Sequence, residues 1–332
     1  MNINQIFELS MVLDNDRFQN VLNRVCRRNG YMEENEDGYI DKAMASKGIT
    51  VIYRNSQYKK KVKLIIEPRL VLDSKVLDSD RFIRKLDKRI NEYFNFKYKL
   101  NNFVLSGVIL TADINVHNHE NVSAYLKVLK RISKVIGYSP VDYDCFEDVD
   151  SFCLVGNSNS ILFWLYDLEG LLESQLKSKE MNQKKIKSII RESENILRAE
   201  VRLTNPKAIR SYTNTDDVFD QIAELTEKRQ EIFLDVFTHI IPFGDFYKKS
   251  EAVEIVRNNV GDGILRRKML RLVTLIPEKK SLYLAQKAMN CRNIEKVMEA
   301  FAKINLSPIT VSKRHDVQYL KNLYSYLLEK FE

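Results

Sequence analysis

Residues 196–203 alternate between apolar and charged side chains, and this alternation constrains the fold more than any other feature of the sequence. Every second residue from Leu197 onward is apolar, and the residues between them are Arg198, Glu200 and Arg202. Because successive side chains of a strand point to opposite faces, such a strand packs on one face and is charged on the other. Parallel sheets are covered on both faces and contain continuous apolar runs, so the alternation favours an antiparallel sheet.

Further strands are predicted by alternation or by β-branched side chains at residues 48–53, 61–72, 103–116 and 160–167. The polar residues 55–57 suit a turn, so the first two of these strands are expected to form a hairpin. Helices are expected over 122–136, where apolar residues follow helical spacing, and over 169–195, which is strongly charged. Strands joined by hairpins and single helices are typical of an α+β fold with helices on one face of an antiparallel sheet.

Beyond Asp216 the sequence predicts helices alone. They are expected at residues 218–236, 250–259, 264–276, 281–289, 293–304 and 315–331. A chain of 332 residues is long enough for two domains of roughly 150 residues each. We therefore expect an antiparallel-sheet domain over residues 1–215 and an all-α domain over 216–332. Short helices joined by short turns suit a helix-turn-helix or winged-helix module.

Composition and the absence of familiar motifs exclude several classes of protein. Hydrophobic residues make up 44% and charged residues 30%, which is typical of a globular protein rather than a disordered or fibrous one. No apolar run approaches the roughly 20 residues of a membrane span, and the first residues lack the features of a signal peptide, so we expect a cytoplasmic protein without membrane contact. GxxxxGKS/T, GxGxxG and HExxH motifs are absent, which leaves nucleotide hydrolysis, dinucleotide oxidoreduction and zinc proteolysis without support.

The cysteines and the net charge constrain the function less than the missing motifs do. The four cysteines stand singly and form no CxxC pair: Cys26, Cys145, Cys153 and Cys291. This spacing supports neither a structural zinc site nor a disulfide framework, so buried thiols are expected. The net charge of +8 favours anionic partners through the field of the whole protein, and the grouping of the charges decides whether nucleic acid is one of them.

A tyrosine follows the charged strand on an expected helix. Asn205 can cap this helix and Pro206 suits its first turn, which puts Tyr212 about two turns into the helix, shortly after Glu200. The residues alone leave a structural interpretation open. In it, the charged face of the strand forms cross-strand ion pairs on a solvated surface, and Tyr212 is a half-buried packing residue.

Several blocks of the sequence, taken in order, resemble one family. The strand Leu197–Leu203 precedes a helical tyrosine, the strand end Trp164–Glu169 lies upstream, and the apolar strand Leu110–Asn115 precedes a helix. Over roughly Val62–Tyr212 the chain thus resembles the rolling-circle replication initiators of Gram-positive plasmids and the replication endonucleases of filamentous phages. Leu168 departs from the family pattern, which often has a lysine at that position.

The resemblance implies a relaxase-like endonuclease with an HUH-type antiparallel sheet. In that family a tyrosine, here Tyr212, attacks a phosphodiester at the origin, becomes linked to the 5′ phosphate and leaves a 3′ hydroxyl for a polymerase. A phenol with a pKa near ~10 is protonated at neutral pH, so the attack needs a base or a metal ion, and Mg²⁺ or Mn²⁺ is the expected cofactor. The implied partners are single-stranded and duplex origin DNA, with a second copy of the chain and a host helicase as further ones.

Carboxylates or imidazoles on one face of the sheet are the ligands expected for this metal. Asp113 and Glu200 stand on the polar parity of their strands and form the preferred pair. His117 and His119 continue the parity of Asp113 if the strand extends that far, and a loop or helix-capping role is their alternative. The block around Leu168 provides the alternates Asp167 and Glu169.

Basic residues beside the expected site and on one C-terminal helix are the predicted DNA contacts. They are Arg198, Arg202, Lys207, Arg210, Arg266, Arg267, Lys268 and Arg271. Because the last four lie within two turns of one helix, at least two of them can meet backbone phosphates at once. The alternative is a solvated helix face on which they pair with Asp262 and nearby glutamates.

Other functions stay open alongside DNA nicking. A non-catalytic DNA-binding replication or partition protein would use the helical domain for recognition, and the absence of a covalent DNA adduct would identify it. A host-interaction or structural protein would carry its charge incidentally, and failure to bind any DNA at low salt would favour it. A conjugative relaxase shares the nicking chemistry and differs in the strand process that it starts.

Overall fold

The computed structural model describes residues 2–29, 33–35, 38–56, 59–74, 76–141, 149–176, 183–291 and 293–328. These residues form the expected α+β fold with a large antiparallel sheet. The strand order is β2-β3-β4-β5-β1-β6-β10-β9-β8-β7, and β11 and β12 form a separate two-stranded sheet. Of the cysteines, Cys145 lies outside the described residues, Cys153 is buried, and Cys26 is exposed, so the expectation of buried thiols is wrong for Cys26. No helix in the described ranges combines the length and apolar character of a membrane span.

The chain forms two compact units, and both are discontinuous in sequence. Unit 1 comprises Met1–Asn2, Thr111–Val201 and Phe233–Glu332, and unit 2 comprises Ile3–Leu110 and Arg202–Ile232. Strands β6 and β10 therefore each contribute residues to both units. The expected boundary between residues 215 and 216 falls inside unit 2, because the helix that follows Asp216 packs with the N-terminal segment rather than with the later helices.

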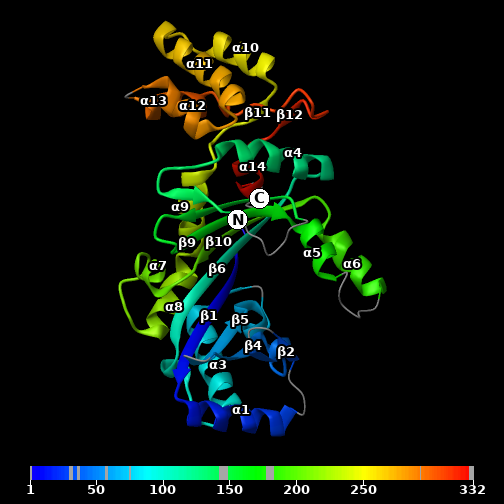
Figure 1. The fold of residues 1–332 in the computed structure, drawn as a ribbon, viewed down its shortest axis with the longest axis vertical. Helices are drawn as coiled ribbons and strands as arrows, with labels where there is room; N and C mark the ends of the chain where they lie inside the picture. The colour runs from blue at the N-terminus through cyan, green and yellow to red at the C-terminus, as the bar shows by residue number, and fades with distance from the viewer. Residues whose placement is uncertain are drawn as a thin grey trace. The chain divides into compact units, whose positions relative to one another are not determined.

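Unit 2 contains most of the strands from the first third of the chain (Figure 1). Its elements, together with the shared strands, are β1 (Asn4–Leu13), α1 (Asn15–Asn29), β2 (Glu33–Asn35), β3 (Gly38–Asp41), η1 (Ala45–Lys47), β4 (Ile49–Asn55), β5 (Lys60–Ile66), α2 (Pro68–Leu72), α3 (Ser79–Tyr93), η2 (Leu100–Asn102), β6 (Val104–Asn115), β10 (Ile196–Leu203), α7 (Pro206–Arg210) and α8 (Val218–Glu227).

One face of the unit 2 sheet forms its core. Alternate residues of β1 are buried, and Phe7 on this face stacks on Phe82 of α3 with ring centroids 5.9 Å apart. Phe18 of α1 meets Tyr53 of β4 edge to face at 6.2 Å. The alternation of buried and less buried residues along β1 therefore reflects a sheet with one covered face, as expected.

The predicted hairpin is confirmed, although its second strand is shorter than expected. β4 and β5 pair antiparallel, with Asn55 opposite Lys60 at the turn end. The strand predicted over 61–72 ends at Ile66, because Pro68 occupies the first turn of α2. Proline suits that position since the first turn of a helix needs no amide donor there.

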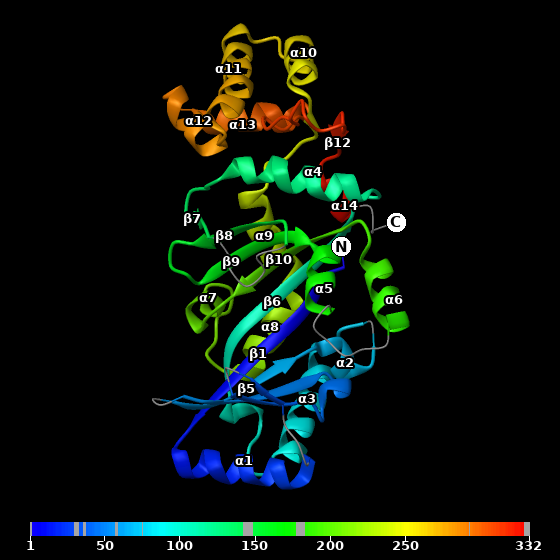
Figure 2. The ribbon, with the colours of Figure 1, turned by 45° about the vertical axis from the view of Figure 1, so that its right-hand side comes forward.

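Unit 1 contains the other strands and the C-terminal helices. Its elements are α4 (His119–Leu129), η3 (Lys130–Ile132), β7 (Tyr138–Pro140), β8 (Ser151–Gly156), β9 (Ile161–Asp167), α5 (Leu168–Leu176), α6 (Gln183–Ser193), α9 (Arg229–Ile240, whose first turn belongs to unit 2), β11 (Phe246–Tyr247), α10 (Lys249–Asn259), α11 (Gly263–Lys279), α12 (Leu282–Met289), α13 (Ile294–Lys303), β12 (Tyr319–Leu320) and α14 (Leu323–Leu328). Helices α10–α13 gather together, with α11 packed against the other three (Figure 2).

Strand β9 is covered on both faces, which corrects the expectation that helices cover one face only. On one face Phe163 packs edge to face against Phe237 of α9, with the ring centroids 6.0 Å apart. On the other face Trp164 and Tyr166 pack in one apolar cluster with Leu171 of α5. The physical reason is that β9 carries apolar side chains on both parities, so each face buries area.

Several predicted helices end or divide differently in the structure. The segment 218–236 divides into α8 and α9 at Lys228, and 122–136 ends as a helix with η3 at Ile132. Residues 169–195 contain α5 and α6, with residues 177–182 outside the described part. The prediction of a helix over 315–331 is wrong for the residues before Leu323, where α14 begins. Among these residues Tyr319 pairs with Tyr247 in a β-ladder, a contact between distant segments that helical periodicity does not reveal.

Gly244 provides a stability prediction for unit 1. Its backbone has φ +117°, and a Cβ atom there would lie 2.4 Å from the backbone carbon of Leu306. Gly244→Ala is therefore expected to lower the free energy of unfolding by about 1–3 kcal/mol, measured by denaturant titration. Gly261→Ala is the control because no atom lies within 4 Å of its added Cβ. Equal effects of the two substitutions would contradict the assigned backbone strain.

Candidate functional site

The charged face of β10 in unit 1 begins with an ion pair across two adjacent strands. Arg198 of β10 donates from Nε to Oδ1 of Asp113 on β6 at 2.6 Å and from Nη2 to Oδ2 at 2.9 Å. Both side chains are less than one-third exposed. Burial lowers the pKa of Arg198, but the hydrogen bonds and charge of Asp113 outweigh it and raise that pKa above its ordinary value. Both oxygens of Asp113 are thus held by one guanidinium.

Glu200 lies on the same face of β10 as Arg198, since the two residues are two apart in one strand. Its side chain is 4% exposed, and its Oε2 accepts a hydrogen bond from the hydroxyl of Tyr166 on β9 at 3.2 Å. Burial, followed by the charge of Glu200, raises the pKa of Tyr166 above its ordinary value. Tyr166 therefore acts here as a hydrogen-bond donor and stays protonated.

These contacts assemble four polar side chains from three adjacent strands, and we call them the carboxylate cluster: Asp113, Tyr166, Arg198 and Glu200. The polar parity of Asp113 in β6 and of Glu200 in β10 predicts one shared face if the two strands are neighbours, and the strands are adjacent with both side chains on that face. The structural alternative expects these charged side chains on a solvated surface, whereas Glu200 is buried. Tyr166 was not among the predicted site residues. Because Tyr166 shares the parity of Trp164 in a strongly apolar strand, the sequence predicts a core residue there rather than a site residue.

The two histidines lie beyond the strand rather than on it. β6 ends at Asn115, and His117 has a left-handed backbone with φ +62° whose amide donates to Oδ1 of Asn115. The expected continuation of the strand parity to His117 and His119 is therefore wrong. The capping role falls to Asn118, whose Oδ1 accepts from the amide of Glu120 at 2.9 Å.

His119 instead meets an acidic residue of the neighbouring helix. Its Nδ1 lies 3.3 Å from Oε2 of Glu169 in the first turn of α5. Burial raises the pKa of Glu169, and the charge of His119 opposes that shift. The amide of Glu169 donates to Oδ1 of Asp167 at 3.1 Å. Within the described ranges, no group of three or more His, Cys, Asp and Glu side chains could hold a metal ion together.

Unit 2 contains Tyr212, just beyond the short helix α7. The predicted start of this helix is confirmed: Oδ1 of Asn205 accepts from the amide of Ala208 at 3.0 Å, and Pro206 opens the helix. The predicted end is wrong, because α7 stops at Arg210 and Tyr212 lies in the following turn. Hydroxyls of the next residues satisfy the last carbonyls, as Ser211 Oγ donates to Ala208 and Thr213 Oγ1 to Ile209.

Tyr212 is half-buried in this turn, and its backbone is well held. Its amide donates to the carbonyl of Ile209 at 3.0 Å, and its carbonyl accepts from Nζ of Lys228 at 3.1 Å. Lys207 and Arg210 are exposed beside it, and Arg210 pairs with Asp216 at 2.6 Å on the surface. The backbone of the turn that carries Tyr212 is therefore fixed within unit 2, and exposed basic residues precede it in the sequence.

The four basic residues predicted on one helix lie on α11 of unit 1. Arg267 and Arg271 are exposed one turn apart, whereas Arg266 and Lys268 are half-buried. Asp262 is used as the helix cap, and hydrogen bonds from the amides of residues 265 and 264 lower its pKa. Among the described residues, no carboxylate forms an ion pair with these four side chains, although the charge of Lys268 also contributes to the lowered pKa of Asp262.

Comparison with known proteins adds little to this geometry. No protein-family profile and no curated protein match the chain. The chain is similar to the solved structure of a rolling circle replication initiator protein from Geobacillus stearothermophilus, with a TM-score of 0.30 and 10% sequence identity. The match covers 77% of this chain and 83% of that chain. Nothing about the function of this chain follows from a likeness at that TM-score.

Proposed function

We propose that this protein initiates rolling-circle replication by nicking DNA at an origin through a covalent phosphotyrosine. The observation that carries the proposal is the placement of Asp113 and Glu200 on one face of the adjacent strands β6 and β10. Tyr212 follows Glu200 by 12 residues, after the capped helix α7. The order of these blocks is the one that the sequence resemblance to plasmid and phage initiators implies.

In the proposed reaction, the Tyr212 oxygen forms a bond to phosphorus and the bond from phosphorus to the 3′ oxygen breaks. The 3′ oxygen leaves with the electron pair and takes up a proton, while the phenol proton passes to a base or to water. The product is a 5′ phosphotyrosine and a free 3′ hydroxyl, so the phosphodiester energy is kept for strand transfer. The half-buried turn around Tyr212 would hold the phenol in place for this attack.

Asp113 and Glu200 would hold the divalent metal, Mg²⁺ or Mn²⁺. Two carboxylates fit such an ion, because Mg²⁺ is usually bound by one or two carboxylates together with substrate phosphates and water. When bound, the metal supplies positive charge against the scissile phosphate. Arg198 occupies both oxygens of Asp113, so the guanidinium and the metal would compete for this carboxylate. His117 and His119 are left out of the proposed ligand set because β6 ends before them.

A non-catalytic DNA-binding replication or partition protein is the second candidate. The observation that favours it is the saturation of Asp113 by Arg198 together with the burial of Glu200, an arrangement that a purely structural ion pair would also have. In that function the basic residues would bind DNA, and no covalent adduct with DNA would form.

The proposed function is tested by incubating the full chain with supercoiled DNA that carries the upstream region of its own gene. With Mg²⁺ or Mn²⁺ we expect conversion to the open circle, and a chelator should prevent it. Supercoiled DNA without this region is the control and should stay intact. Binding without nicking in both metals would overturn the proposed enzyme and favour the second candidate.

Helix α11 is proposed to contact the DNA backbone through Arg267 and Arg271. Each phosphate contact contributes about 0.9 to the slope of log affinity against log salt, so the double alanine variant should lower that slope by about 1 to 2. The measurement is a salt titration of duplex binding with the full chain. Lys303→Ala, on the exposed end of α13, is the control. An unchanged slope in the double variant would remove α11 from the DNA contact.

A further inference from the structure

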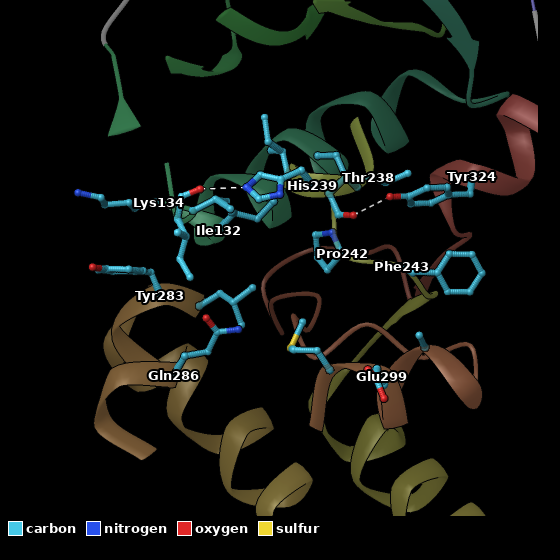
Figure 3. A pocket seen from close by; sticks show the side chains of 17 residues that line it. Ile132, Lys134, Thr238, His239, Pro242, Phe243, Tyr283, Gln286, Glu299 and Tyr324 are labelled. Carbon is cyan, nitrogen blue, oxygen red and sulfur yellow. Dashed lines mark hydrogen bonds between the residues drawn. The ribbon is translucent and has the colours of Figure 1, made fainter. Parts of the chain in front are cut away.

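A groove of about 500 Å³ lies within unit 1 where the end of α9 meets α12, α13 and the segment after η3 (Figure 3). We call it the α12 groove. Its apolar lining includes Ile132, Ile136, Pro242, Phe243, Leu282 and Met298. This size and composition are typical of a binding site rather than of a packing defect. None of the groups in the carboxylate cluster lines it.

The walls of the groove are tied to one another by hydrogen bonds. His239 Nε2 donates to the carbonyl of Ile136 at 2.9 Å, and the hydroxyl of Tyr324 donates to the carbonyl of Ile241 at 2.9 Å (Figure 3). The hydroxyl of Ser281, which also caps α12, forms a hydrogen bond with that of Ser133. A groove with fixed walls loses little entropy on binding, which favours recognition by a preformed surface.

Apolar side chains continue from the groove onto the open surface. Ile136 is 81% exposed and Phe243 is 43% exposed, and both also line the groove. Ile136 stands in a turn closed by the β-bridge between Val135 and Tyr138, with Gly137 at φ +84°. A small molecule that filled the groove would leave most of Ile136 in water. Exposed apolar residues of this kind mark protein interaction sites.

One end of the groove is positively charged. The ammonium groups of Lys134 and Lys287 lie 5.8 Å and 4.8 Å from the ring centre of Tyr283. A hydrogen bond to Lys287, with the charges of both lysines, lowers the pKa of the Tyr283 phenol. In the part of the chain that the structure describes, no carboxylate pairs with either lysine. Glu299 lines the groove apart from this end (Figure 3).

We propose that the α12 groove binds an apolar segment of another protein that carries an acidic residue, whose carboxylate meets Lys134 and Lys287 while its apolar side chains enter the groove. Complementary charge at the rim and an apolar centre are the ordinary anatomy of such an interface. A nucleic-acid strand would suit Tyr283 and the lysines. The lining is mostly aliphatic, however, and the carboxylate of Glu299 within it would repel the phosphates of a strand, so the geometry favours a protein. This inference does not depend on the proposed nicking activity.

The test is selection of random 12-residue peptides, displayed on phage, against the immobilised full chain. Binding of the selected synthetic peptides is then measured by fluorescence anisotropy. We expect enriched peptides that combine aliphatic or aromatic residues with Asp or Glu. Their affinity should fall at least about tenfold, ~1.4 kcal/mol, in the Lys134→Glu/Lys287→Glu variant. Ala302→Trp, which fills the groove, should have the same effect, and Arg257→Glu on α10 should have none.

Three results would overturn the proposal. Selected peptides could be basic or lack acidic residues, or they could bind all the variants equally well. The third result is that fluorescent oligothymidine binds the wild type but not the Lys134→Glu/Lys287→Glu variant. The positively charged end of the groove would then be a nucleic-acid contact. Both lysines are exposed, so their double variant should fold normally even if Ala302→Trp does not, and circular dichroism checks this.

Discussion

Tyr212→Phe is expected to abolish the covalent protein–DNA adduct while leaving DNA binding within about twofold of the wild type. The substitution removes one hydroxyl from a half-buried side chain whose backbone is held by Ile209 and Lys228, so packing in the turn should survive. Without the phenol oxygen no bond to phosphorus can form. The measurement is the denaturation-resistant complex with labelled DNA on a gel, together with a binding titration of the same variant.

Tyr247→Phe is the matched control for this prediction. It also removes one phenol hydroxyl from a half-buried tyrosine, but it lies in unit 1 on the two-stranded sheet. The control variant should form the adduct at the wild-type level. If Tyr212→Phe still forms the adduct, the nucleophile is another tyrosine, and loss of the adduct in Tyr247→Phe would identify it.

Asp113→Asn and Glu200→Gln are each expected to lower metal-dependent nicking by about 100-fold, a loss typical of removing one group that stabilises charge in a transition state. DNA binding should change far less, because neither carboxylate contacts phosphate directly. Asp113→Asn also leaves Arg198 without its charged partner, so it should lower the free energy of unfolding by about 1–3 kcal/mol. Nicking rates at saturating Mg²⁺ and denaturant titrations measure the two effects.

Asp216→Asn is the control for these carboxylates. It breaks an Asp–Arg pair of the same type, with Arg210, in which both side chains are more than half exposed. Exposed pairs contribute only about 0.2–1 kcal/mol, so both stability and nicking should stay close to the wild type. If Asp113→Asn and Glu200→Gln nick at the wild-type rate, the carboxylate cluster is structural and holds no catalytic metal.

Local sequence patterns predicted those parts of the fold that depend on one strand or one helix end. The alternation in β10 placed Arg198 and Glu200 on one face, and its counterpart in β6 placed Asp113 on the polar parity. Asn205 and Pro206 correctly marked the start of α7. These features follow from backbone periodicity and capping chemistry, which act over a few residues.

Parts of the structure that depend on distant contacts could not be predicted in this way. Glu200 is buried and accepts a hydrogen bond from Tyr166, a residue of another strand that the pattern of β10 alone does not reveal. Tyr319 and Leu320 form a strand rather than a helix because they pair with Tyr247 and Phe246, and the amide of Asn322 donates to Asp245, 77 positions earlier. The units divide within β6 and β10, so no composition shift marks their boundary. Tertiary contacts override helical periodicity at such places.

The identity of the residue that becomes linked to DNA tests the central claim most directly. The full chain would be incubated with Mg²⁺ and the origin DNA, the adduct would be digested with nuclease and trypsin, and the peptides would be analysed by mass spectrometry. Trypsin cleaves after Arg210 and Lys228, so Tyr212 is the one tyrosine in the peptide 211–228. We expect a nucleotide phosphate on this peptide. A nucleotide on any other peptide, or on none while the DNA is bound, would contradict the account.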